Sequence, residues 1–200
     1  DHKDHDDHDD HKDHDDHDDH KDHDDHDDHD DHEGHDHGDH DPHAWLSPTI
    51  AKVWLNEIAA KLSVIDPDNA GTYFSNAALG KQELDSLSAE INVLLDPVRD
   101  KKFVVFHDAY QYFEKDFNIS ASGAISLGDA STPSPSRLAE VRERVVNESV
   151  QCVLAEPQYK QGLVAAVVEG TEANTAVIDP LGAELEVGPT LYTDLIRNLA

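Results

Sequence analysis

The chain has 200 residues, and 44 acidic side chains against 15 basic ones give it a formal net charge of −29. This charge argues against a nucleic-acid-binding protein, because phosphate neutralisation needs lysine and arginine gathered on one face. No apolar run approaches the roughly 20 residues that span a bilayer. The single cysteine, Cys152, cannot form a disulfide within the chain, so it is compatible with a reducing compartment or with a partner outside the chain.

Residues 1–40 differ in composition from everything that follows. They hold 14 of the 16 histidines, 20 aspartates, one glutamate and three lysines, a net charge of −18, and no hydrophobic residue. The sequence DHKDHDDHD occurs at 1–9, 10–18 and 19–27, and a degenerate copy follows at 28–36. Histidine recurs at every third residue, which is not a helical period, and aspartate is a poor helix former. We therefore expect a disordered, extended tract, with histidines along one edge of a polyproline-II-like chain.

This tract of histidine and aspartate is predicted to bind metal reversibly. Neutral imidazole is a good ligand for zinc, nickel and copper, and the aspartates add carboxylate oxygens. Many equivalent ligands without packed surroundings imply many weak, exchanging sites. The alternative is a solvated spacer that binds metal only incidentally. Our hypothesis is that the tract concentrates or buffers zinc for a second site, so that deletion of residues 1–36 reduces uptake under zinc starvation.

Two helices are predicted at the start of the remaining 160 residues. Ser47-Pro48 is a good helix start, and apolar residues follow at helical spacing: Ile50, Val53, Trp54, Ile58 and Leu62. Asp66-Pro67 repeats this signal and predicts a helix over 67–95, about 40 Å long, which exceeds a typical globular helix. Its expected apolar stripe is Phe74, Ala77, Leu84, Leu87, Ile91 and Leu94, and Gly80 could bend or interrupt it.

Strands and helices alternate beyond residue 100. We expect strands at 102–106, 119–127, 152–155 and 175–178. Helices are expected through Tyr110 and Phe113, from Ser134-Pro135 with an apolar side, at 161–168 and at 191–199. Short apolar strands that alternate with helices are typical of an α/β domain with a mostly parallel sheet and flanking helices.

Three of the predicted strands are followed by residues that bind metals in other proteins. FVVF precedes His107, CVLA precedes Glu156, and TAVI precedes Asp179. Open parallel sheets bind ligands beyond the carboxyl ends of their strands, so these side chains are expected at one edge. Each also has an ordinary structural interpretation: His107 as a hydrogen-bonded group at a helix N-terminus, and Glu156 and Asp179, each before proline, as turn or capping residues.

A fourth candidate, His43, lies in the segment DPHAWLSP before the first predicted helix. It could be the last histidine of the tract, whose three-residue phase it continues from His37. Its context is different, however, because Trp45, Leu46 and a capped helix follow at once.

Several motifs together resemble a known family. They are DPHAWLSP at 41–48, DPDNAGTY at 66–73, FVVFHDAYQYFE at 103–114, PSPSRLAEV at 133–141, CVLAEPQY at 152–159 and DPLGAEL at 179–185. In order and spacing they resemble the metal-binding subunit of ABC importers for zinc and manganese. The zinc-uptake branch, which carries a His- and Asp-rich loop before its DPHxWLSP motif, is the most similar. The resemblance covers essentially all of residues 41–200.

The resemblance implies two α/β lobes joined by a long rigid helix, with metal held between the lobes. Residues 1–40 would be the metal-binding tract, 41–65 the end of the N-terminal lobe, 66–99 the linking helix and 100–200 the C-terminal α/β lobe. It also implies three metal ligands: His43, His107 and Asp179, the last of which lies near zinc or is replaced there by water. Glu156 would lie in the cleft wall or contact a metal ligand rather than the metal itself. Manganese members commonly carry glutamate at the position of His107, so histidine there favours Zn²⁺ over Mn²⁺.

The sequence departs from the family in lacking the first half of the first lobe, and with it another histidine ligand. It begins within a repeat and without methionine, so we interpret it as a mature or truncated fragment. The apolar face of the helix at 48–63 would then lack its packing partners. Zinc members with cysteine at the position of Cys152 can pair it with a cysteine near the C-terminus, so the resemblance implies a disulfide in the full-length protein.

The resulting interpretation is a monomeric, periplasmic or surface-tethered zinc receptor that delivers zinc to an ABC permease in the membrane and is not an enzyme. One alternative is a His-rich metal-storage or chaperone protein in which the tract is the main site. Another is a manganese receptor of the same family. A zinc hydrolase would need an open coordination position and a general base, for which Asp108 or Glu156 could serve, but the sequence has no HExxH, GxSxG or phosphate-binding glycine loop.

Overall fold

The computed structural model describes residues 41–128 and 132–200. The tract predicted at 1–40 lies outside these ranges. The described part contains four strands and six α-helices, and three short 3₁₀ helices at Ala44–Leu46, Pro67–Asn69 and Asp96–Val98. No helix of this part combines the length and the apolar character needed to cross a membrane.

The strands form one parallel sheet. β1 (Phe103–His107), β2 (Ala124–Ser126), β3 (Cys152–Ala155) and β4 (Asn174–Val177) lie in the order β2-β1-β3-β4. The chain passes from β1 to β2 at one edge and then returns across β1 to form β3, so the strand order reverses between β1 and β3. In open α/β sheets the crevice at such a switch point is where ligands bind. The predicted α/β class is confirmed.

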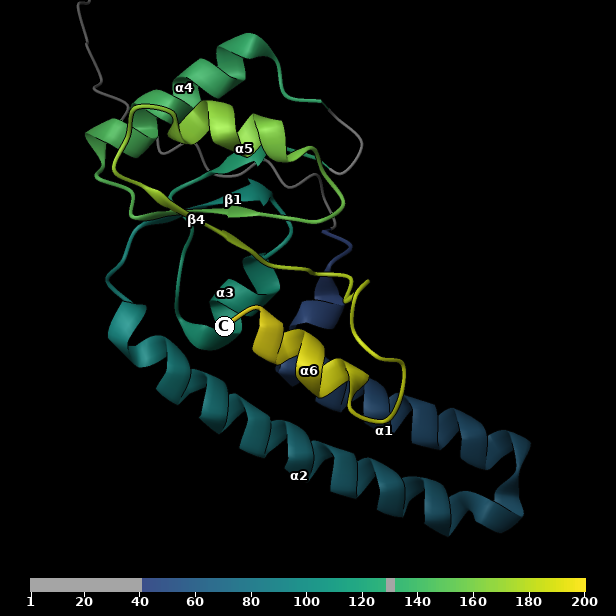
Figure 1. Ribbon diagram of the computed structural model, residues 1–200. Helices are drawn as coiled ribbons and strands as arrows, with labels where there is room; N and C mark the ends of the chain where they lie inside the picture. The colour runs from purple at the N-terminus through teal and green to yellow at the C-terminus, as the bar shows by residue number, and fades with distance from the viewer. Residues whose placement is uncertain (1–40, 129–131) are drawn as a thin grey trace, which may run out of the picture. The chain divides into compact units, whose positions relative to one another are not determined.

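Helices cover both faces of this sheet (Figure 1). α4 (Pro135–Asn147) and α5 (Gln161–Val168) lie on one face, and α3 (Gln111–Phe117) and α6 (Leu191–Asn198) lie on the other. Successive residues of a strand point to opposite faces, so β1 contributes to two cores. Val104 and Phe106 belong to the core under α4 and α5, whereas Val105 belongs to the core with α3 and α6. Burial on both faces explains why β1 is a continuous apolar run.

α1 (Pro48–Ile65) and α2 (Ala70–Leu95) form an antiparallel hairpin (Figure 1). Ser47 caps α1, because its Oγ accepts a hydrogen bond of 3.0 Å from the N–H of Ile50. The Lys52 ammonium lies 2.7 Å from Asp85 across the hairpin. Gly80 does not interrupt α2; a Cβ at this position would lie 3.1 Å from Leu55 Cδ1, so glycine permits the close approach of α1.

The apolar stripe predicted for α1 lies largely at the surface. Val53, Trp54, Ile58 and Leu62 are 38–56% exposed, whereas Ala51 and Ala59 are buried. Among the described residues, this helix face is therefore exposed. On α2, four predicted core residues are buried, but Phe74 and Leu94 are exposed and Leu95 takes the core position instead.

Differences in the C-terminal half concern element boundaries. His107 is the last residue of β1 rather than the residue after it, and β4 begins one residue earlier than predicted. The strand predicted at 119–127 is reduced to Ala124–Ser126. α5 has the predicted bounds, and α6 ends one residue earlier than predicted.

Candidate metal centre

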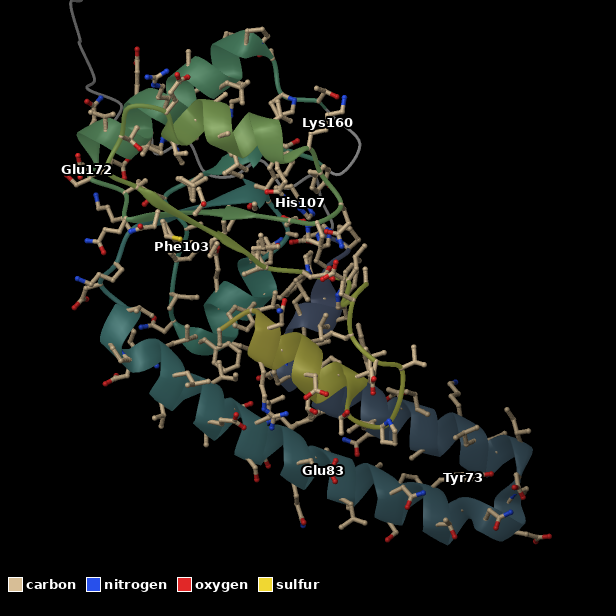
Figure 2. The ribbon with its side chains drawn as sticks, in the orientation of Figure 1. Tyr73, Glu83, Phe103, His107, Lys160 and Glu172 are labelled. Atoms are coloured by element: carbon tan, nitrogen blue, oxygen red, sulfur yellow. The ribbon has the colours of Figure 1, made fainter. Side chains whose placement is uncertain are left out.

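His107 and Glu156 meet at the switch point of the sheet. His107 ends β1 and Glu156 follows β3, its neighbour, so both side chains lie at the carboxyl edge. Figure 2 shows His107 at the opposite end of β1 from Phe103. The Nδ1 atom of His107 lies 2.7 Å from one carboxylate oxygen of Glu156 and 2.9 Å from the other. Because carboxylate oxygens accept hydrogen bonds, Nδ1 is the donor in this contact, and Nε2 is the ring nitrogen that Glu156 does not contact.

His43 approaches from a different part of the chain. Its Nε2 atom lies 3.5 Å from Nε2 of His107, and the two rings meet edge to face with centroids 5.3 Å apart. The Nδ1 atom of His43 lies 2.7 Å from Asp41 Oδ1, which also accepts the backbone N–H of His43 at 2.8 Å. Both imidazoles are thus buried, have a carboxylate at Nδ1, and direct Nε2 toward the other ring.

Long-range hydrogen bonds fasten the segment that carries His43 to the sheet domain. The indole N–H of Trp45 donates to the carbonyl of Pro180 at 3.0 Å, and the Tyr192 hydroxyl donates to the Trp45 carbonyl at 2.9 Å. The Ser47 hydroxyl donates to Asp116 at 2.7 Å. These contacts reach the loop after β4, α6 and α3, so the position of His43 is set by three elements of residues 100–200.

Asp179 lies in the loop after β4 and is buried. Its Oδ1 accepts from the Gln158 side chain at 2.6 Å, and its Oδ2 accepts from the N–H of Ala183 at 2.6 Å. Burial acts to raise the pKa of Asp179, but hydrogen bonds from Gln158 and from three backbone N–H groups outweigh it and hold the pKa below its usual range. The carboxylate therefore organises its own turn.

Within residues 41–128 and 132–200, no three or more histidine, cysteine, aspartate or glutamate side chains stand together as a ready metal-binding group. The four residues predicted from sequence are all buried at or after strand ends or in the loop before α1. The structure brings His43, His107 and Glu156 into direct contact as a chain. Asp179 is tied to this region through its loop, whose Pro180 carbonyl accepts from Trp45.

Tyr110 belongs to the hydrophobic core and lies close to Glu156 and His107. Burial raises the pKa of its hydroxyl far above the usual range, and the negative charges of Glu156 and Asp179 raise it further. The hydroxyl therefore stays protonated beside the two carboxylates. Its ring centroid lies 6.1 Å from that of His107.

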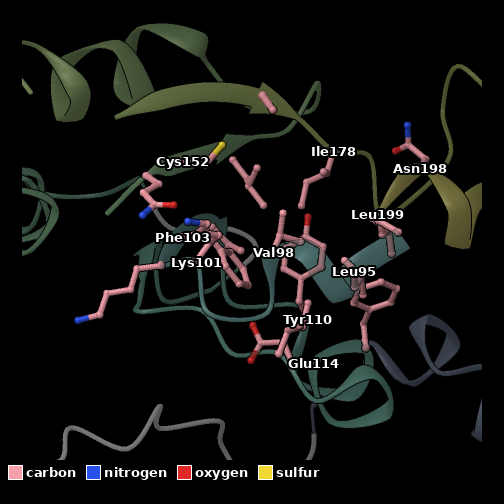
Figure 3. Close-up of a pocket in the computed structure, with 18 of the residues that line it drawn as sticks. Leu95, Val98, Lys101, Phe103, Tyr110, Glu114, Cys152, Ile178, Asn198 and Leu199 are labelled. Carbon is pink, nitrogen blue, oxygen red and sulfur yellow. The ribbon is translucent and has the colours of Figure 1, made fainter. Parts of the chain in front are cut away.

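An apolar cavity of about 430 Å³ lies apart from both histidines. Figure 3 shows Phe103, Cys152 and Ile178 around it, with Leu95 and Leu199 on the helix side. Tyr110 contributes to its wall, but neither His43 nor His107 does. The cavity lining contains neither candidate imidazole, so we place the candidate metal centre at the carboxyl edge of the sheet.

Asp41 and Gln158, which hydrogen-bond to His43 and Asp179, were not among the site residues predicted from sequence. The signal for Asp41 is local: an aspartate accepts readily from the backbone N–H two residues later, and Asp41-Pro42-His43 has this spacing. Gln158 gives no comparable signal, because its contact with Asp179 joins loops that follow different strands.

Buried imidazoles backed by carboxylates at the switch point of a parallel sheet define the class of protein, an α/β protein with a candidate metal centre. The chain belongs to the family described as ZnuA, zinc-uptake complex component A periplasmic, whose model matches residues 2–200.

Relatives and solved structures agree with this family. The chain is 45% identical over 158 residues to the high-affinity zinc uptake system protein ZnuA of Brucella abortus (strain 2308), covering 79% of this chain and 47% of that protein. A crystal structure of ZnuA matches with a TM-score of 0.69 and 30% identity, covering 80% of this chain and 57% of that one. A zinc-bound ZnuA deletion mutant matches with a TM-score of 0.67 and 30% identity, covering 80% and 58%. The chain thus spans about half the length of the curated relative.

Proposed function

We propose that this chain is part of a high-affinity zinc receptor that delivers zinc to an ABC permease. The observation that carries the proposal is the 3.5 Å separation of the Nε2 atoms of His43 and His107. Two nitrogens bound to one tetrahedral zinc at about 2.0–2.1 Å lie about 3.3 Å apart. The imidazoles therefore stand at nearly the separation that a shared zinc ion requires.

In this proposal His43 and His107 are zinc ligands and Asp179 supplies a third ligand, directly or through water. Glu156 orients His107, as carboxylates commonly do behind zinc-bound imidazole. Further coordination would come from residues outside the described ranges. Imidazole ligands favour zinc, a borderline-soft ion, over manganese, which prefers oxygen.

The proposed organisation follows the family. Residues 41–65 end the N-terminal lobe, 66–99 form the linking helix and 100–200 form the C-terminal lobe. The exposed apolar face of α1 suits a helix that packs against further polypeptide of the first lobe, because a row of four half-exposed apolar side chains is a typical interaction surface. The tract at 1–40 concentrates zinc near the site, and deletion of residues 1–36 is the test of that role.

The relatives are named as zinc-uptake proteins, which supports a periplasmic location, a permease partner and a binding rather than catalytic role for this chain. We propose a monomeric receptor, and the described residues suit binding rather than hydrolysis. Each candidate imidazole is fixed by a carboxylate at Nδ1 and buried, an arrangement that holds an ion firmly.

The test is zinc titration of the full chain in competition with a chromophoric chelator. The double variant His43→Ala/His107→Ala should lose the tightest site, while the weak sites of the tract remain. A matched control, His35→Ala/His37→Ala, removes two histidines from the tract and should keep the tightest site. Unchanged tight binding in the first variant would instead support a storage protein whose main site is the tract. Preferential binding of manganese over zinc would support a manganese receptor.

A further inference from the structure

All three oxygen atoms of Asp41 accept hydrogen bonds, from His43 or from residues of α3. Its side chain is 2% exposed. Oδ1 accepts the backbone N–H of His43 and lies 2.7 Å from Nδ1 of the same residue. Oδ2 accepts from the side-chain amide of Gln111, and the backbone carbonyl of Asp41 accepts from the Tyr112 hydroxyl at 3.1 Å. A buried carboxylate needs such donors, because leaving it unpaired is costly.

The double contact of Oδ1 restricts the imidazole of His43. One oxygen bridges the backbone N–H and the ring Nδ1, so rotation of the ring about either side-chain torsion breaks the second contact. In this contact Nδ1 donates to the carboxylate, so Nε2, which faces His107, is the ring nitrogen placed toward a metal ion. Asp41 thereby selects both the direction and the tautomer of the ring.

Gln111 holds Asp41 in the conformation that makes this possible. It is the first residue of α3, which follows β1, the strand that ends at His107. The link Gln111–Asp41–His43 therefore begins on the same stretch of chain that positions His107. This link and the hydrogen bond from Tyr112 fix the position of the His43 ring relative to the His107 ring through two residues of α3.

We propose that Asp41 is a positioning residue for zinc binding, and that Gln111 acts through Asp41 to keep Nε2 of His43 directed at the shared ion. The proposal rests on the proposed role of His43 as a zinc ligand. Loss of the orienting carboxylate behind a zinc-bound histidine typically weakens metal binding by about 10–100-fold. The same loss of zinc affinity is expected for Asp41→Ala in this chain. Asp41→Asn should lose less, because the amide oxygen can still accept the hydrogen bonds of Oδ1, although the negative charge is gone.

The experiment has two readouts on the full chain. Long-range ¹⁵N–¹H NMR of the metal-free protein reports which nitrogen of His43 carries hydrogen, with the signals assigned by their absence in His43→Gln. Zinc affinity is measured by chelator competition. In the unsubstituted protein His43 should be hydrogenated at Nδ1. Asp41→Ala should give a mixture of tautomers and weaker binding, and Gln111→Ala should shift both readouts in the same direction while the turn itself remains.

The control is Asp85→Ala, which removes an exposed aspartate from α2 and should leave both readouts unchanged. An unaltered tautomer and affinity in Asp41→Ala and Gln111→Ala would overturn the proposal, even if His43→Ala abolished tight binding. A changed tautomer in Asp41→Ala with tight binding unaffected by His43→Ala would retain the orienting contact but reject His43 as a ligand. If Asp41→Ala is too unstable to study, Asp41→Asn and Gln111→Ala supply the same comparison.

Discussion

The Nε2 atoms of His43 and His107 face each other at 3.5 Å, although the two residues are 64 positions apart. Each ring has its other nitrogen occupied by a carboxylate, Asp41 in one case and Glu156 in the other. In the proposed zinc site, two donor nitrogens would therefore be held in place before an ion arrives. Such preorganisation increases affinity, because little conformational freedom remains to be lost on binding.

Removing the carboxylate behind His107 should weaken zinc binding. Glu156 is 1% exposed and contacts Nδ1 of His107 with both oxygens. We expect Glu156→Gln to reduce zinc affinity by about 10–100-fold, measured by chelator competition. Glu83→Gln on the exposed face of α2 is the control (Figure 2) and should have the affinity of the unsubstituted protein. Equal affinities of the two variants would contradict an orienting role for Glu156.

Asp179 should stabilise the fold independently of any metal. Asp179→Ala leaves the N–H groups of Leu181 and Ala183 without their acceptor, which should lower the free energy of unfolding by about 1–3 kcal/mol. Urea unfolding in the presence of a chelator measures this change. Asp179→Asn should cost less, because one oxygen remains as an acceptor.

The contribution of Asp179 should also depend on pH. Since folding lowers its pKa from the usual 3.8, its stabilisation is fully present above that value and is lost as the pH falls through the lower folded pKa. The stability difference between the unsubstituted protein and Asp179→Asn should therefore shrink in acid. A difference that is constant from neutral pH into this acidic range would show that ionisation of Asp179 is not involved.

The cap of α1 should matter more than that of α4. Ser47 is buried, accepts from Ile50 and donates to Asp116, so Ser47→Ala should cost about 0.5–2 kcal/mol, toward the upper end. Ser134 caps α4 at the surface, and Ser134→Ala should fall toward the lower end. Thermal or urea unfolding of both variants makes the comparison. An equal cost would mean that the bond to Asp116 contributes nothing.

Cys152 should react slowly as a thiol. Burial raises its pKa, which lowers the fraction present as the reactive thiolate, although a backbone hydrogen bond at Ala176 opposes this shift. In the reduced protein we expect slow alkylation that accelerates on unfolding. In the unreduced full-length protein, the disulfide implied by the family would leave no titratable thiol even in denaturant. A thiol that titrates freely under those conditions would reject the disulfide.

The contact between His107 and Glu156 was foreseeable, because both follow neighbouring apolar strands and parallel strands end at one edge. The position of His43 was not, since it depends on hydrogen bonds such as Trp45 to Pro180, 135 residues apart. On α2, periodicity identified an apolar stripe but could not decide which side of the last turn faces the sheet domain. Leu95 is buried where Leu94 was expected, because the helix presents that side to the core.

The two long-range hydrogen bonds of Trp45 bear on how zinc would be released from the proposed site. Its indole is bonded to the loop after β4 and its carbonyl to α6, and both elements pack with the sheet that carries His107. The segment that carries His43 is consequently fastened to the elements that position His107. If the chain is part of the proposed zinc receptor, withdrawal of the other ligands would leave the ion on two imidazole nitrogens, a weaker site. In that case the two-nitrogen site would be an intermediate in both directions: an ion would occupy it last on release and first on binding.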